Sequence, residues 1–233
     1  MRLMLYNGSP RGKGSNTTIL LKHFIDGFTA TQGNTVEYVY LNNVKGHAAA
    51  AAKWREADAV IIAFPLYADS MPAVVKDFIE TLGAGRKKPK KTAKGGRVAP
   101  EKNPPLGFIV QSGFPEAIHS RYVEKYLEKL AGRLGSRYIG TIIRGGVEGI
   151  QVMPPYLNRR LFMAFSCLGR HFGVTKEFHP ITMRKLAGRD RMTAFKQGMF
   201  RLLIATGLAD SYWNSQMKKN GAYERRFDQP YQP

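Results

Sequence analysis

"NGSPRGKGSNTT" (residues 7–18) joins a short apolar run, Leu3–Tyr6, to an amphipathic pattern that begins near Thr17. Glycines, hydroxyl groups and basic residues between a strand and a helix are typical of phosphate-binding loops, because the N–H groups at a helix N-terminus attract anions. An ordinary turn that caps a helix favours Ser, Asn and Thr as well. The loop alone leaves these two interpretations open.

The spacing of its glycines excludes two common phosphate-binding loops. A Walker A loop has four residues between its first glycine and the Gly-Lys pair, followed by Ser or Thr. Here three residues separate Gly8 from Gly12, and Gly14 stands where the hydroxyl residue belongs. The dinucleotide fingerprint G-x-G-x-x-G is also absent, because Gly8 is the lone early glycine. The remaining polar residues suit one compact phosphate dianion: Ser9, Ser15, Asn16, Thr17 and Thr18.

Five apolar or alternating runs are separated by helical patterns over residues 1–150. The expected strands are Arg2–Tyr6, Thr35–Leu41, Ala59–Phe64, Leu106–Gln111 and Tyr138–Arg144. The expected helices are Thr17–Ala30, Ala48–Ala57, Pro72–Leu82 and Arg121–Leu134. Strands this apolar, separated by helices, predict a parallel sheet that is covered on both faces. Five such units predict an α/β, flavodoxin-like doubly wound fold with strand order 2-1-3-4-5.

The remaining residues predict helices and no further strand. These helices are Tyr156–Phe172, Arg191–Thr206 and Ser211–Lys218. The chain is therefore expected to hold a flavodoxin-like domain over residues 1–150. A helical extension over residues 151–233 is expected to pack on the same domain.

Composition limits the class of protein. The single cysteine, Cys167, excludes an internal disulfide, and its place in the apolar run Leu161–Leu168 predicts a buried structural thiol. No stretch approaches the roughly 18–20 apolar residues of a membrane span, and the N-terminus lacks the apolar core of a signal peptide. The histidines are scattered, so no metal site is expected. These features predict a cytoplasmic protein without a membrane span.

The formal net charge of +19 is unusual for a globular chain of 233 residues. Part of it lies in residues 86–102, which hold eight Lys and Arg residues and one acid, Glu101. No aromatic side chain is interleaved there for stacking on bases. The segment is therefore expected to be an exposed, solvated loop, and nucleic acid is not expected as a partner.

In the predicted strand order, the loops after the first, third and fourth strands meet at the carboxyl edge of the sheet, where ligands bind. "PLYADSMP" (65–72) follows the third strand and "SGFPEAIH" (112–119) the fourth, each with an aromatic residue, Tyr67 or Phe114. A phosphate cradle beside flat surfaces suits a ligand with one phosphate and a large planar ring, such as FMN. Taken alone, Tyr67 and Met71 are better interpreted as an apolar rim on the next helix.

Together, "GSPRGKGSNT", "PLYADSMPAVVKDFIE" and "SGFPE" resemble the three ligand loops of the NAD(P)H-dependent FMN reductase family, over about residues 1–145. The resemblance implies FMN as the cofactor and NADH or NADPH as the co-substrate. It implies that the phosphate is held by Ser9, Arg11, Ser15, Asn16 and Thr17. It implies that the flavin ring is lined by Pro65, Leu66, Tyr67 and Met71 and enclosed by Ser112, Gly113 and Phe114. The iron–sulfur branch of the family is excluded, because no cysteine follows the second strand.

These inferences predict an FMN-dependent NAD(P)H oxidoreductase that passes electrons to a quinone-like or other small acceptor. No catalytic side chain is expected, because the flavin carries the chemistry. The alternatives are a flavodoxin-type electron carrier without NAD(P)H activity and, after it, a polyanion-binding module. The acceptor and the choice between NADH and NADPH stay open. So does the role of the C-terminal extension, which could cover the flavin or form the contact of a homodimer.

Overall fold

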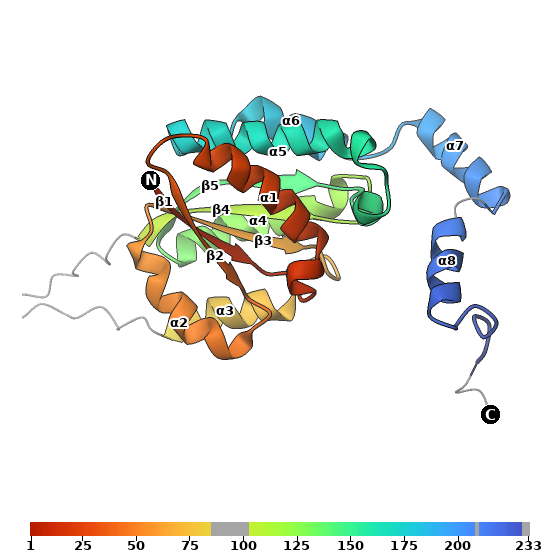
Figure 1. Ribbon diagram of the computed structural model, residues 1–233, viewed down its shortest axis with the longest axis horizontal. Coiled ribbons are helices and arrows are strands. Elements are labelled where there is room, and N and C mark those ends of the chain that lie inside the picture. Colours follow the sequence, from red (N-terminus) through yellow and green to blue (C-terminus); the bar gives the residue numbers. More distant parts are fainter. Residues whose placement is uncertain (85–102, 208–209, 230–233) are drawn as a thin grey trace, which may run out of the picture. The chain divides into compact units, whose positions relative to one another are not determined.

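The computed structural model describes residues 1–84, 103–207 and 210–229 (Figure 1). The basic segment 86–102, predicted to be a solvated loop, lies outside the described residues. The chain divides into two compact units, Met1–Asp190 and Arg191–Pro233. The first unit contains the whole sheet, and its description comes first.

Five parallel strands form one sheet in the order β2-β1-β3-β4-β5. Their bounds are Arg2–Asn7 (β1), Thr35–Tyr40 (β2), Ala59–Pro65 (β3), Asn103–Gln111 (β4) and Ser136–Arg144 (β5). Every residue of the central strand β3 is buried, as expected for a strand covered on both faces. The predicted flavodoxin-like, doubly wound fold is confirmed.

Helices cover both faces of this sheet (Figure 1). One face carries α1 (Asn16–Thr29), α5 (Pro155–Thr175) and α6 (Pro180–Ala187), and the other carries α2 (His47–Ala52), α3 (Ala73–Ala84) and α4 (Ile118–Arg133). Alternate residues of β1 enter opposite cores: Leu3 and Leu5 face α1 and α5, whereas Met4 and Tyr6 belong to the core under α2, α3 and α4. The period of two along a strand thus builds two cores on one sheet.

Helix α5 packs very closely on α1. A Cβ atom added to Gly27 would lie 1.9 Å from the carbonyl oxygen of Ser166, and one added to Gly169 would lie 1.9 Å from that of Phe24. Glycine at these two positions lets the helix backbones approach. The compact unit ends at Asp190, so it includes α5 and α6, which lie within residues 151–233, the range expected to form the extension.

Two features of this face differ from expectation. The sequence analysis did not predict helix α6. Cys167 is exposed, so the prediction of a buried thiol is wrong. The buried residues of α5 include Phe165, Leu168 and Phe172, which recur every three or four residues, and Cys167 lies off that stripe. An apolar run within a helix does not bury all of its members.

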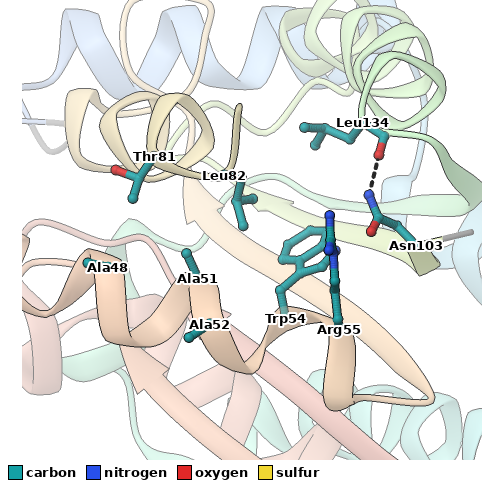
Figure 2. A pocket seen from close by; sticks show the side chains of 9 residues that line it. All are labelled: Ala48, Ala51, Ala52, Trp54, Arg55, Thr81, Leu82, Asn103 and Leu134. Atoms are coloured by element: carbon teal, nitrogen blue, oxygen red, sulfur yellow. Dashed lines mark hydrogen bonds between the residues drawn. The ribbon is translucent and has the colours of Figure 1, made fainter. Parts of the chain in front are cut away.

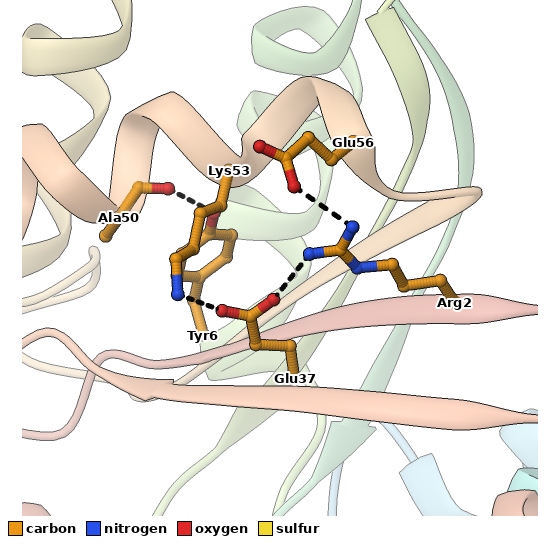
Figure 3. Close-up of polar contacts among 6 residues, drawn as sticks. All are labelled: Arg2, Tyr6, Glu37, Ala50, Lys53 and Glu56. Atoms are coloured by element: carbon orange, nitrogen blue, oxygen red, sulfur yellow. Dashed lines mark hydrogen bonds and ion pairs between the residues drawn. The ribbon is translucent and has the colours of Figure 1, made fainter.

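Polar contacts tie the start of β1 to the neighbouring elements (Figure 3). The Arg2 guanidinium donates to Glu37 of β2 at 2.8 Å and pairs with Glu56 at 3.0 Å. Lys53 donates to the other oxygen of the Glu37 carboxylate. These side chains reach solvent, so their contribution to stability is small, and they lie at the amino edge of the sheet.

The second unit is described by itself. It contains α7 (Ala194–Ala205) and α8 (Ser211–Lys219), in agreement with the helices predicted there. No residue of α7 is buried. The predicted packing of residues 191–233 on the sheet domain stays a prediction. In the described part of the chain, no helix is both long enough and apolar enough to cross a membrane.

Candidate functional site

A cavity of about 110 Å³ lies at the carboxyl ends of the strands. It draws its lining from the loops after β1, β3 and β4, as predicted, and from the segment after β5. Nine of the twelve predicted site residues line it, together with Gln111 and Glu148. These nine are Ser9, Arg11, Ser15, Asn16, Pro65, Leu66, Tyr67, Ser112 and Gly113. Thr17, Met71 and Phe114 are outside the lining.

The side chain of Asn7, the last residue of β1, holds the first loop in place through hydrogen bonds. Its Nδ2 donates to the Tyr38 hydroxyl at 2.8 Å and to Thr18 Oγ1 at 2.9 Å. Its Oδ1 accepts from the backbone N–H of Ser9 at 2.9 Å. Burial raises the pKa of Tyr38 to about 12, so this phenol is neutral at ordinary pH. A fully buried amide that joins β1, β2 and α1 fixes the direction in which the loop leaves the sheet.

The start of α1 is capped by its own sequence. Ser15 Oγ accepts from the N–H of Thr18 at 3.2 Å, and Thr18 Oγ1 donates to the carbonyl of Gly12 at 3.0 Å. Gly12 has a φ of +55°, which favours glycine. The capping interpretation of this loop is therefore correct for Ser15. The first-turn N–H groups of Asn16 and Thr17 have no acceptor inside the helix, so they remain suited to an anion.

Asn16 and Thr17 also hold protein partners. Asn16 Nδ2 donates to the carbonyl of Val147 at 2.9 Å, and its Oδ1 accepts from Gln151 at 2.6 Å. Thr17 Oγ1 accepts from Gln111 at 3.3 Å. The phosphate contacts predicted for these two residues stay a prediction.

The loop after β3 presents Tyr67 on a tight turn. The N–H groups of Tyr67 and Ser70 each donate to the other residue's carbonyl at 2.9 Å. Between them, Ala68 and Asp69 have φ values of +44° and +62°. Residues other than glycine adopt this left-handed backbone conformation at a cost in free energy. The Tyr67 side chain is left 44% exposed. Met71 instead packs on the core under α3, as the interpretation of an apolar rim predicts.

The loop after β4 is shaped by the segment that follows β5. Ser112 Oγ donates to the carbonyl of Phe114 at 3.0 Å, and the N–H of Gly146 donates to the same oxygen at 3.0 Å. The carbonyl of Ser112 accepts from the N–H of Val147 at 3.1 Å. The Phe114 ring is 56% exposed and stacks on His119, with centroids 4.4 Å apart. The hydroxyl of Ser112 thus has a structural partner, and Phe114 offers an exposed flat surface.

The segment 145–151 forms a fourth wall of the site, which was not predicted from the sequence. The 3₁₀ turn η4 (Glu148–Gln151) brings the Glu148 carboxylate into the cavity, close to Gly113. Gln151 Nε2 donates to the carbonyl of Gly14 at 3.1 Å, so this wall is bonded directly to the first loop. The only sequence signal for it is the pair Gly145-Gly146 directly after an apolar strand.

A larger cavity, of about 380 Å³, lies at the opposite edge of the sheet (Figure 2). Its lining includes Trp54, Arg55, Leu82 and Asn103, the first residue of β4. Doubly wound sheets bind ligands beyond the carboxyl ends of their strands, so the smaller cavity is the candidate functional site. Among the described residues, no group of His, Cys, Asp and Glu side chains could hold a metal ion.

Comparison with known proteins agrees with this fold. A family model described as a flavodoxin-like fold matches residues 1–156. A search of curated protein sequences finds no match. Among solved structures, the FMN-dependent NADH-azoreductase from Bacillus anthracis is 16% identical with a TM-score of 0.55, and the match covers 74% of this chain and 99% of that one.

Two further structures have the same fold. An NADPH-quinone reductase from P. pentosaceus is 22% identical with a TM-score of 0.50, and the match covers 71% of this chain and 96% of that one. An NADH:FMN oxidoreductase is 17% identical with a TM-score of 0.53, covering 78% and 94%. At these sequence identities, the similarity shows a shared fold alone. The family model, however, matches more than half of the sequence. The chain therefore belongs to the flavodoxin-like fold family.

Proposed function

We propose that this protein is an FMN-dependent NAD(P)H oxidoreductase that passes electrons to a quinone-like or other small acceptor. The observation that carries the proposal is that three loops at the carboxyl edge of the sheet line one cavity. Arg11, the N-terminus of α1 and the exposed Tyr67 all line this cavity. Similar folds are found in an NADH-azoreductase, an NADPH-quinone reductase and an NADH:FMN oxidoreductase, which supports the same class of activity here.

The donor set fits the phosphate end of FMN. Ser9, Arg11 and the first-turn N–H groups of α1 would hold the phosphate, since a helix N-terminus and a guanidinium both favour an anion. A volume of about 110 Å³ is below the ~300–1,000 Å³ of a typical small-molecule site. The flavin ring would therefore lie at the open rim, bordered by Pro65–Tyr67 and Ser112–Phe114.

Bound FMN would supply the hydride and electron chemistry, and the chain would supply position and electrostatics. The N–H groups of Leu66, Tyr67 and Ser112 already donate to protein carbonyls. Gly113 and Phe114 are therefore our candidates for N–H donors toward negative charge on a reduced ring. Glu148 lines the same cavity, and its carboxylate would oppose such charge. The rim would keep one face of the ring open to nicotinamide and acceptor.

An anaerobic reduction experiment tests this function. The purified protein is loaded with FMN and mixed with NADH or NADPH while the oxidised flavin band is followed. Bleaching by either nucleotide, reversed by an added quinone, is the expected result. If neither nucleotide bleaches the band although dithionite does, the protein is an electron carrier and the enzyme proposal is wrong.

A further inference from the structure

Helix α7 carries many large apolar side chains, and nothing within its own unit buries them. Six of its twelve side chains are large and apolar, and all six are exposed. They are Phe195 (81%), Met199 (51%), Phe200 (48%), Leu202 (65%), Leu203 (37%) and Ile204 (52%). Its polar side chains are Lys196, Gln197 and Arg201, and apolar surface on this scale is normally covered by a protein partner or a lipid phase, so α7 calls for a partner outside its own unit.

The helix itself is well defined by its sequence. Thr193 Oγ1 accepts from the N–H of Lys196 and caps the N-terminus, and Gly207, with a φ of +71°, follows the last turn. At 1.5 Å per residue, twelve residues extend about 18 Å. A membrane core is ~30 Å thick, so α7 is too short to cross one and could only lie along its surface.

Charge narrows the choice of partner. Residues 191–233 contain seven Lys and Arg residues against three acids, and the whole chain carries +19. A second copy would bring the same positive charge to the contact, which opposes association. A membrane of anionic lipids offers both an apolar layer and negative charge, and basic amphipathic helices bind such surfaces.

Aromatic residues of the same unit fit the same partner. Trp213 of α8 is 55% exposed and Phe227 is 80% exposed. The Arg226 guanidinium lies 4.7 Å from the centroid of the Phe227 ring and 3.9 Å from that of Tyr223. Trp and Tyr are enriched where protein meets lipid headgroups, and Lys and Arg are attracted to anionic lipids. We propose that α7, aided by the basic residues of its unit, binds the surface of an anionic membrane.

Vesicle co-sedimentation of the full chain tests this proposal without any flavin assay. We expect binding to vesicles of phosphatidylcholine mixed with phosphatidylglycerol, weaker binding as salt screens the charges, and little binding to phosphatidylcholine alone. Phe195→Ser combined with Leu202→Ser removes apolar contact and should lower the partition coefficient by roughly tenfold or more. Lys196→Gln combined with Arg201→Gln should lower it by roughly tenfold as well.

Tyr122→Ser is the matched control, because Tyr122 is 72% exposed on α4 in the other unit; it should leave binding unchanged. Failure of the wild-type chain to bind anionic vesicles would overturn the proposal. So would a fall in the melting temperature of the sheet unit in the Phe195/Leu202 variant, which would mean that α7 packs on its own chain. Conversion of a dimer to a monomer by that variant would assign α7 to a second copy instead.

Discussion

Asn7 and Arg11 have opposite roles in the first loop. Asn7 is fully buried and its amide bonds inside the protein, whereas Arg11 is exposed and lines the cavity. A buried polar group with every partner in place rigidifies its surroundings. An exposed guanidinium beside a helix N-terminus is available to a ligand. We therefore assign loop geometry to Asn7 and ligand affinity to Arg11.

Replacing Arg11 tests the phosphate end of the site. A hydrogen bond to a charged group contributes about 1.5–3 kcal/mol, so Arg11→Ala should weaken FMN binding by roughly 10- to 100-fold. Flavin fluorescence titration measures the change. Lys13→Ala is the control, because Lys13 is exposed and outside the cavity lining. Equal affinities for the wild type and Arg11→Ala would show that the phosphate lies elsewhere.

Replacing Tyr67 shows whether its side chain contacts the flavin ring or packs in the core. Its side chain is 44% exposed on a tight turn, so little apolar burial is lost when it is truncated. Tyr67→Ala should shift the absorption spectrum of the bound flavin and slow its turnover, with the melting temperature nearly unchanged. A clear loss of stability with an unaltered spectrum would instead make Tyr67 a packing residue.

The raised pKa of Tyr38 predicts that the folded protein loses stability at alkaline pH. Burial raises its pKa to about 12 from an ordinary value of 10.0, so the folded protein holds this proton over a range in which the unfolded chain releases it. Stability is therefore retained below pH 10 and falls as the pH rises toward 12. Tyr38→Phe should remove up to about 2 kcal/mol of that fall. Urea unfolding at several pH values measures it, and an identical slope in the variant would refute the assignment.

The pairing of α1 with α5 depends on two glycines. A methyl group at Gly169 would lie 1.9 Å from the carbonyl oxygen of Phe24, and backbone atoms cannot rotate away as a side chain can. Gly169→Ala should destabilise the protein by about 1–3 kcal/mol or more, as overpacking does. Gly132→Ala in α4 is the matched control, because its methyl group meets nothing within 4 Å. Urea unfolding that gives equal midpoints for both variants would show that α5 does not need this close approach.

The elements that the sequence predicted well are those with strong periodicity. Strand β3 is apolar throughout and α3 has a clear buried face, so local pattern alone identifies them. Helix α6 has only eight residues, so its core-facing apolar residues Met183, Leu186 and Ala187 span little more than one turn and give a weak periodic signal. Cys167 was misplaced because an apolar run does not show which face of a helix turns inward. These errors come from tertiary contacts, which no local pattern contains.

The candidate site was predictable where it depends on topology and not where it depends on long-range bonds. Strand order brings the loops after β1, β3 and β4 together, and nine predicted residues accordingly share one cavity. The bond from Asn16 to Val147 spans 131 residues, and that from Gln151 to Gly14 spans 137. Only the folded chain shows that residues 145–151 close the site and that Asn16 joins its walls.

The exposed side of the proposed ring site predicts the order in which substrates bind and leave during turnover. The exposed Tyr67 and Phe114 side chains leave one side of the proposed ring site open, so nicotinamide and acceptor would use the same face in turn. One must leave before the other binds, which gives ping-pong kinetics. Varying NAD(P)H at several fixed quinone concentrations should give parallel double-reciprocal lines. Lines that intersect would mean that both substrates bind together, and the second would then need a separate site on the protein.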